Sequence, residues 1–148
     1  MLKILERNGD AHMTVYDSIV PLMGRILISV IFLLSGITKV MNFSGMVAFM
    51  ASKGMPMPNV MIAGALIVEI LGALCLITGF QTRIASLIMF LYVIAATLMF
   101  HNFWTMQGAM RTDNQVNFLK NVAIMGGLLM VASYGPGRLS VDASRTRV

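Results

Sequence analysis

Long apolar stretches separated by short polar breaks organise this chain. They cover residues 19–40, 59–79, 84–101 and 116–134, and each approaches the ~20 apolar residues that a helix needs to cross a bilayer. The short segment GFQTR leaves room only for a tight turn, so the second and third stretches should form a helical hairpin. No alternation of apolar and polar residues competes with this interpretation. The pattern predicts an all-α integral membrane protein, a four-helix bundle.

The composition agrees with a surface that faces lipid. Hydrophobic residues make up 57% of the chain and charged residues only 11%, against about 25% charged residues in an ordinary globular domain. The net charge of +5 comes from basic residues scattered singly beside the apolar stretches. That arrangement is usual in membrane proteins and argues against a nucleic-acid partner. The first partner that the sequence predicts is therefore the lipid bilayer.

Three parts follow from the pattern. Residues 1–18 form a polar leader, residues 19–134 a four-span transmembrane domain, and residues 135–148 a basic tail. Lysines and arginines near the spans are more numerous on the side of the two termini, which the positive-inside rule places in the cytoplasm. We expect a multi-pass protein with both termini cytoplasmic. The basic residues on that side are Lys3, Arg7, Arg83, Arg138, Arg145 and Arg147, against Lys53, Arg111 and the span-end Lys39 on the other.

The sequence holds no signature of a bound redox cofactor. Cys75 is the single cysteine, which excludes an intrachain disulfide and any all-cysteine metal or iron–sulfur site. His12 in the leader and His101 at the end of the third span are poorly placed to hold a haem between them. No flavin fingerprint is present. We predict no metal site, and the cofactor stays open, with a quinone as the candidate.

Charged residues inside the apolar stretches carry the candidate chemistry. A charge at bilayer depth costs at least about 2.5–3.5 kcal/mol on insertion scales, so each one needs a reason. Glu69 lies midway along the second span, and Arg25 and Lys39 lie in the first. The spacing of Arg25 and Lys39 puts both on roughly one helix face, about 21 Å apart along the axis.

Polar groups from the other two spans complete the set. Asn117, Lys120 and Asn121 stand at i, i+3 and i+4 and form one polar face of the fourth span. His101 ends the third span. Four helices that point such groups inward would form a polar pocket, with Glu69 as its floor.

The pocket hypothesis gives each residue a role. Lys39 or Lys120 supplies the counter-charge of Glu69. Glu69 and His101 are the candidate catalytic residues, because a carboxylate and an imidazole can exchange protons with a bound ligand. Arg25 is assigned to a structural ion pair. The candidate ligand-binding residues are Lys39, Lys120, Asn117 and Asn121.

Each assignment has a structural alternative. Glu69 can pair with Arg25 or Lys120 only to hold the helices together, since buried ion pairs occur without function. The lysine and arginine side chains can extend to the headgroups. His101, close to Trp104, fits an interfacial belt of aromatic residues, and the asparagines fit hydrogen bonding between helices.

Five segments occur in a characteristic order: GRILISVIFLLSGITKVMNF, KGMPMPN, VEILGALCLITGFQTRIA, HNFW and NFLKNVAIMGGLLMV. Together they span nearly everything from Val20 to Tyr134, and they resemble the DoxX family of small bacterial inner-membrane proteins. The resemblance implies a four-helix membrane bundle in the bacterial inner membrane. The family pattern falls on Arg25, Gly36, Lys39, Gly54, Pro56, Glu69, Gly72, Gly79, Arg83, His101, Lys120, Asn121 and Gly127.

The resemblance also implies an association with redox chemistry, because relatives include a subunit of thiosulfate:quinone oxidoreductase. We expect no additional soluble part of the kind that a self-sufficient thiosulfate oxidase would need, and the sequence shows no group that carries electrons. We therefore expect an accessory subunit of an oxidoreductase that works with a redox partner subunit, rather than a complete enzyme.

Three functions are compatible with these observations. The leading hypothesis is a small integral subunit of a quinone-linked redox system that binds a quinone-like or small anionic ligand in the polar pocket. The alternative is a non-catalytic membrane scaffold or assembly factor, whose polar groups only specify the bundle. The third is a small transporter, which would need to form a homo-oligomer because four spans are few. Glu69→Gln separates the first two: a ligand site predicts a folded protein without binding, and a structural pair predicts misfolding.

Overall fold

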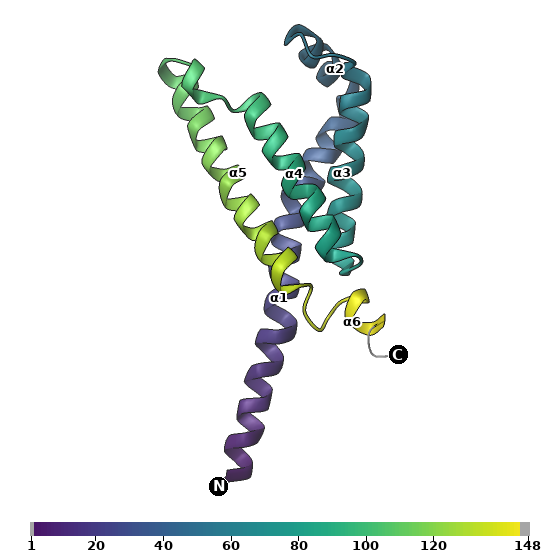
Figure 1. The fold of residues 1–148 in the computed structure, drawn as a ribbon, viewed down its shortest axis with the longest axis vertical. Helices are drawn as coiled ribbons and strands as arrows, with labels where there is room; N and C mark the ends of the chain where they lie inside the picture. Colours follow the sequence, from purple (N-terminus) through teal and green to yellow (C-terminus); the bar gives the residue numbers. More distant parts are fainter. Residues whose placement is uncertain (1, 146–148) are drawn as a thin grey trace.

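The computed structural model describes residues 2–145, with side chains from residue 16 onward, and this part of the chain is helical and contains no strand (Figure 1). The leader up to residue 15, with the side chains of Lys3, Arg7 and His12, and the tail residues 146–148 lie outside the described side chains. In chain order the elements are α1 (Leu2–Met41), α2 (Phe43–Ser52), α3 (Pro58–Thr78), α4 (Thr82–Phe100), the 3-10 helix η1 (Phe103–Thr105), α5 (Gly108–Tyr134) and α6 (Val141–Arg145).

Four segments of the described chain are long and apolar enough to cross a membrane. The predicted all-α membrane bundle is therefore confirmed. The segments are Tyr16–Met41, Pro58–Thr78, Thr82–Thr105 and Gly108–Tyr134.

The local sequence explains the hairpin of α3 and α4. Pro58 occupies the first turn of α3, where a missing backbone N–H costs nothing because that donor would have no partner within the helix. Gly79 ends α3 in the left-handed region at φ 72°, and its N–H donates to the carbonyl of Cys75. Glycine enters this region without the steric cost that a Cβ brings. Gly79, Phe80 and Gln81 form the whole connection to α4.

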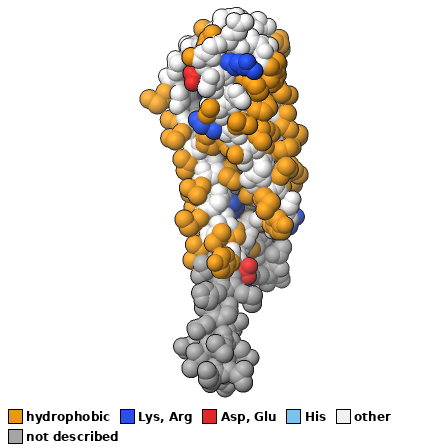
Figure 2. Space-filling model, turned by 90° about the vertical axis from the view of Figure 1, so that its left-hand side faces the viewer, with side chains coloured by type: hydrophobic (Ala, Val, Ile, Leu, Met, Phe, Trp, Pro, Cys, Tyr) orange, Lys and Arg blue, Asp and Glu red, His pale blue; other side chains and the backbone are white. Residues whose placement is uncertain are grey.

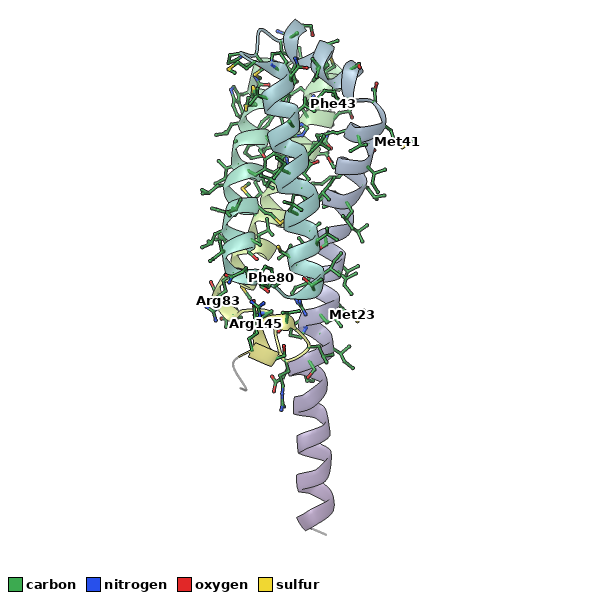
Figure 3. The ribbon with its side chains drawn as sticks, turned by 90° about the vertical axis from the view of Figure 1, so that its right-hand side faces the viewer. Met23, Met41, Phe43, Phe80, Arg83 and Arg145 are labelled. Atoms are coloured by element: carbon green, nitrogen blue, oxygen red, sulfur yellow. The ribbon has the colours of Figure 1, made fainter. Side chains whose placement is uncertain are left out.

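The helix bounds differ from the predicted spans in three places. Helix α1 begins at Leu2 rather than near residue 19, so the predicted polar leader continues the first span as a helix. The connection after the first span contains α2, a mainly apolar helix of 10 residues, FSGMVAFMAS, which is too short to cross a bilayer. Figure 3 labels Met41 and Phe43, between which α1 gives way to α2. Helix α5 begins at Gly108 rather than near residue 116, because the polar residues that precede the apolar stretch continue the helix.

The spans pack in the order α1, α3, α4 and α5, with α4 between α3 and α5 (Figure 1). Their core is small, and most other apolar side chains face outward, as Figure 2 shows for the face on the left of Figure 1. Such an exterior suits a lipid environment, because a soluble protein rarely exposes contiguous apolar surface on this scale. The buried core consists of Phe32, Ala73, Leu76, Met89, Val93 and Leu128.

The segment that follows α5 folds back under the bundle. The N–H of Arg138 donates to the carbonyl of Asp17 at 3.0 Å, and the N–H of Asp142 donates to the carbonyl of Gly79 at 2.9 Å. Arg145 lies over the ring of Phe80, 4.9 Å from its centroid, and both are labelled in Figure 3. The predicted tail is thus packed against the end of the bundle as far as Arg145.

Asp142 joins this segment to the start of α4. Its carboxylate accepts hydrogen bonds at 2.9 Å from the N–H groups of Gln81 and Thr82 and from the hydroxyl of Thr82. These bonds satisfy donors that a helix N-terminus leaves free. Burial alone would raise the pKa of Asp142, but the hydrogen bonds from Thr82 and Gln81 and the nearby Arg145 outweigh it, so the pKa lies below its ordinary value.

Candidate functional site

Glu69 is the centre of a polar cluster built from three helices. It lies on α3 and is 3% exposed. The ammonium of Lys39, on α1, donates to its two carboxylate oxygens at 2.8 and 3.0 Å. The hydroxyl of Tyr92, on α4, donates to Oε1 at 2.6 Å, and that of Ser35 donates to the same oxygen at 3.1 Å. Of the partners that the sequence leaves open for Glu69, the structure pairs it with Lys39.

Helical spacing on α1 positions two of these groups. Ser35 and Lys39 stand four residues apart and therefore share one face, and Lys39 Nζ donates to Ser35 Oγ at 2.6 Å. The opposite charges of Lys39 and Glu69 cancel, and the hydrogen bonds between them are of the stronger, charge-assisted kind. The cluster is neutral as a whole and internally well satisfied.

A cavity of about 700 Å³ adjoins the cluster. Its walls are mainly apolar, and α1 to α5 all contribute to them. Glu69, Lys39, Ser35 and Tyr92 form one polar part of the wall. The remaining lining residues are Ile31, Phe32, Met46, Phe49, Met50, Lys53, Met61, Ile62, Gly64, Ala65, Val68, Val93, Ala95, Ala96, Met99, Phe100, His101, Asn121 and Ile124.

Two further candidates from the sequence line the same cavity. His101 follows α4, and its Nδ1 lies 3.1 Å from Asn114 Oδ1. Asn121, on α5, donates from Nδ2 to Thr97 Oγ1 at 2.9 Å. An amide has two N–H donors and a carbonyl acceptor, so this bond engages only part of Asn121. The structure thus brings Lys39, Glu69, His101 and Asn121 to one cavity.

The other two polar residues of the fourth span do not line this cavity. Lys120 is exposed and Asn117 is half-buried. The counter-charge of Glu69, which the sequence leaves open between two lysines, is therefore Lys39. Lys120 lies on the outer surface of α5, where a long side chain can extend along the helix toward the headgroups.

Arg25 lies in a separate place, near the end of the bundle that the C-terminal segment closes. It is completely buried. Its guanidinium donates to the carbonyls of Leu76 at 2.8 Å and Ile77 at 3.4 Å, and to that of Leu139 at 2.5 Å. The sequence suggested an ion pair for Arg25, but its hydrogen bonds in the structure run to backbone carbonyls.

Sequence reasoning missed Tyr92 and the helix α2. A signal for Tyr92 existed, because a tyrosine hydroxyl inside an apolar helix needs a hydrogen-bond partner. Helix α2 carried the weaker signal of an apolar run too short to span the membrane, and it supplies Met46, Phe49 and Met50 to the cavity wall. Among the described residues, no group of three or more His, Cys, Asp or Glu side chains could hold a metal ion.

Comparison with known proteins identifies the chain's relatives. The family model of DoxX matches residues 20–102. The chain belongs to the DoxX family. It is 37% identical to the inner membrane protein YphA of Escherichia coli strain K12 over 121 residues, which cover 82% of this chain and 86% of YphA. The inner membrane protein YqjF of the same strain is 31% identical over 121 residues, or 82% of this chain and 88% of YqjF.

A more distant similarity reaches a eukaryotic protein. The ER-derived vesicles protein ERV29 of Saccharomyces cerevisiae is 32% identical over 79 residues, which cover 53% of this chain and 26% of ERV29. No solved structure matches the chain significantly. The membership in the DoxX family agrees with the resemblance carried by the ordered motifs and with the four membrane-spanning segments of the described chain.

Proposed function

We propose that this DoxX protein is a small subunit of a quinone-linked redox system in the bacterial inner membrane, and that its cavity binds the head of a lipid-soluble quinone. The observation that carries the proposal is the Lys39–Glu69–Tyr92 cluster in the wall of a cavity of about 700 Å³ that is otherwise mainly apolar. Ligand sites typically combine an apolar wall with a few placed polar groups.

The charge balance favours a neutral head over a small anion. Lys39 already faces Glu69 at 2.8 Å, so the cluster offers no net positive charge. An anion would approach the carboxylate of Glu69 as closely as the ammonium of Lys39. A neutral carbonyl or hydroxyl group avoids this repulsion and can exchange hydrogen bonds with the cluster and with the free part of the Asn121 amide.

Each residue of the site has a chemical role in this proposal. A quinone takes up protons when it is reduced, and the electrons would come from a partner subunit. Glu69 accepts or returns a proton, while Lys39 stabilises its carboxylate and Tyr92 holds Oε1 in place. His101 lines the same cavity with Nδ1 beside Asn114, which leaves Nε2 to exchange protons with the cavity.

The test is binding of decylubiquinone to the purified protein in nanodiscs. Tyr92→Phe removes one donor to Glu69, and we expect it to weaken binding about tenfold, the value of a single hydrogen bond of this kind. Glu69→Gln should still fold and should bind more weakly still. Tyr134→Phe is the matched control, because Tyr134 is 79% exposed at the end of α5, and it should bind as the wild type does.

Equal binding by wild type, Tyr92→Phe and Glu69→Gln would contradict the proposal. So would a wild-type protein that folds in nanodiscs and binds no quinone at any concentration. Native mass spectrometry of protein extracted gently from its membrane supplies an independent measurement, since a co-purified quinone should be present with wild type and absent with Glu69→Gln.

One observation favours the scaffold alternative. The three N–H donors of Lys39 and the hydroxyls of Ser35 and Tyr92 are all engaged inside the cluster, as expected of groups that only hold helices together. A scaffold predicts that replacing the whole pair by apolar residues leaves function intact. A ligand site predicts that the same replacement abolishes quinone binding.

The orientation is part of the proposal. With both termini cytoplasmic, as the distribution of lysines and arginines suggests, Lys53 and His101 would mark the periplasmic end of the cavity. A green fluorescent protein fused to the C-terminus should fluoresce in this orientation, because that protein matures in the cytoplasm. A dark fusion that is nevertheless expressed and inserted would reverse the assignment.

A further inference from the structure

Four of the residues that line the cavity from α3 and α4 are very small. Gly64 and Ala65 line it from α3, and Ala95 and Ala96 line it from α4. Gly64 and Ala95 are also exposed. A Cβ added at Gly64 would meet no atom within 4 Å. Gly64 and Ala95 are therefore accessible residues of the cavity wall, whereas Ala65 and Ala96 are half-buried.

These small residues lie near the polar cluster. The bond from Tyr92 to Glu69 fixes both residues at one level of the antiparallel pair α3 and α4. Gly64 comes five residues before Glu69, about 7.5 Å along the axis, and Ala95 lies about 4.5 Å beyond Tyr92. Both displacements point away from the turn that joins the two helices. The two residues thus stand roughly one helical turn from the cluster, on the same side of it.

Helices α3 and α4 separate in that direction. Close to their turn they are tightly packed, and a Cβ added at Gly72 would come within 2.6 Å of the sulfur of Met89. At Gly64 no neighbour is within contact distance of such an atom. Figure 1 shows the two helices diverging from the turn. We call the space beside the cavity between Gly64 and Ala95 the lateral window.

We infer that the ligand of this cavity is a membrane-resident amphiphile that enters sideways through the lateral window, between α3 and α4. Its polar head reaches Lys39, Glu69 and Tyr92, and its apolar tail passes Gly64 and Ala95 into the lipid. The inference rests on the proposed ligand site but not on the ligand being a quinone. The cavity wall matches such a molecule, because a polar cluster lies in a mainly apolar wall and the exposed small residues Gly64 and Ala95 line the same cavity.

The cavity has other borders through which a ligand could pass. Lys53 and His101 line it toward the end of the bundle, where a water-soluble molecule would enter. Ile31 lines it from α1 and is 45% exposed, which marks a second exposed border on α1. The experiment has to separate these routes from the lateral window.

Thiol labelling measures access without any natural ligand. The lone cysteine is first removed by Cys75→Ser, and Ser35→Cys then places a thiol in the cluster. In the wild type the Ser35 hydroxyl lies 2.6 Å from the Lys39 ammonium. A neighbouring ammonium favours the reactive thiolate form of a cysteine. The protein is reconstituted in liposomes and treated with N-phenylmaleimide, which is apolar, or with a sulfonated, membrane-impermeant maleimide. We expect the apolar reagent to label the thiol at least about tenfold faster, because it partitions into the bilayer.

Filling the lateral window should slow that reaction. Gly64→Leu combined with Ala95→Leu fills the lateral window with two larger side chains. We expect the rate of labelling by N-phenylmaleimide to fall about tenfold, because closely packed side chains leave no room for the reagent to pass. The matched control is Gly126→Leu combined with Ala123→Leu. These residues are exposed on α5 and do not line the cavity, so labelling should stay within about twofold of the parent.

Three results would overturn lateral entry between α3 and α4. The window variant could be labelled as fast as the control variant, or the sulfonated reagent could react as fast as N-phenylmaleimide. The third is that Ile31→Trp slows labelling while the window variant does not. Folding of every variant is checked by its elution as a single species in detergent. Slow labelling in the window variant together with absent quinone binding would reject the quinone and leave lateral entry of another amphiphile standing.

Discussion

Two buried charges, Arg25 and Glu69, lie at different levels of the same bundle and are satisfied in different ways. Arg25 is 0% exposed and Glu69 is 3% exposed. Arg25 donates to backbone carbonyls of α3 and of the C-terminal segment. Glu69 accepts from three side chains that line a cavity. Arg25 and Glu69 are thus similarly buried, but the partners of Arg25 are backbone groups and those of Glu69 are side chains beside a cavity.

The kind of partner indicates what each charge does. The carbonyls of Leu76 and Ile77 belong to the last turn of α3, where a helix leaves acceptors free and carries partial negative charge. Arg25 therefore completes a helix end and fastens the C-terminal segment to it. Side-chain partners beside an open space can instead rearrange around a ligand. We therefore assign Arg25 to structure and Glu69 to the proposed site.

The largest predicted loss of stability comes from Arg25, at the end of the bundle that the C-terminal segment covers. Arg25→Met removes the donors to Leu76 and Leu139 and leaves their carbonyls buried without partners, which should lower the free energy of unfolding by about 3 kcal/mol. The measurement is thermal unfolding in detergent, followed by size-exclusion chromatography. Arg83→Met, at an exposed arginine beside the same end, is the control and should change little. A melting temperature for Arg25→Met equal to that of the control would remove Arg25 from its structural role.

A smaller effect is expected from the cap that Asp142 forms on α4. Asp142→Ala frees the N–H groups of Gln81 and Thr82 and should lower the free energy of unfolding by about 1 kcal/mol. Asp113→Ala, at an exposed aspartate of α5, is the comparison. Proteolysis should also release the C-terminal segment faster in Asp142→Ala, and equal protection in both variants would show that the cap does not hold the segment.

The same residue gives a pH dependence with a definite sign. The folded protein lowers the pKa of Asp142, so its contribution to stability is complete above the pKa of the unfolded chain and is lost as the pH falls through the folded value. Between neutral pH and about pH 3, wild type should lose more stability than Asp142→Ala. Parallel losses would show that the capping bonds do not depend on the charge.

Removal of the Asn121–Thr97 hydrogen bond should have a smaller effect. Thr97→Val deletes the acceptor that joins α4 to α5 at 2.9 Å, and bonds of this kind inside membranes are worth about 0.6 kcal/mol. Thr38→Val is the matched control, because the hydroxyl of Thr38 bonds only within its own helix, to Leu34, on an exposed face. Unfolding of the two variants in detergent, compared at several denaturant concentrations, would resolve the difference; a loss several times larger would mean that Asn121 also organises the cavity.

The smallest change in stability is predicted for the removal of the whole ion pair. Lys39→Met together with Glu69→Leu should leave the free energy of unfolding unchanged, since buried ion pairs can often be replaced by apolar residues at no cost. Glu69→Leu alone leaves Lys39 without its partner and should be clearly less stable than the double variant. A double variant as damaged as Arg25→Met would show that the two buried charges play the same structural part.

The sequence predicted much of this architecture correctly. Apolar stretches of the right length determine the spans, because each backbone polar group in lipid must be satisfied within a helix. A carboxylate at mid-span requires a counter-charge, so a partner for Glu69 could be expected. The ordered motifs also indicated the DoxX family, which the family model supports.

Only the tertiary structure decided which groups meet. The i, i+3, i+4 spacing of Asn117, Lys120 and Asn121 shows that they share a face, but not where that face points, because the rotation of α5 is set by packing against α4. In the structure Asn121 reaches the cavity and Lys120 does not, which leaves Lys39 as the partner of Glu69. Tyr92 joins the cluster from the neighbouring helix for the same reason.

The C-terminal segment gives the second lesson. By composition it is a short basic tail, with nothing apolar or periodic enough to predict its position. It is held by hydrogen bonds to the carbonyls of Asp17 and Gly79 and from the guanidinium of Arg25, partners that are distant in the sequence. Spans and buried charges are determined locally by the cost of polar groups in lipid, whereas pairing, cavity and closure depend on how the finished helices pack.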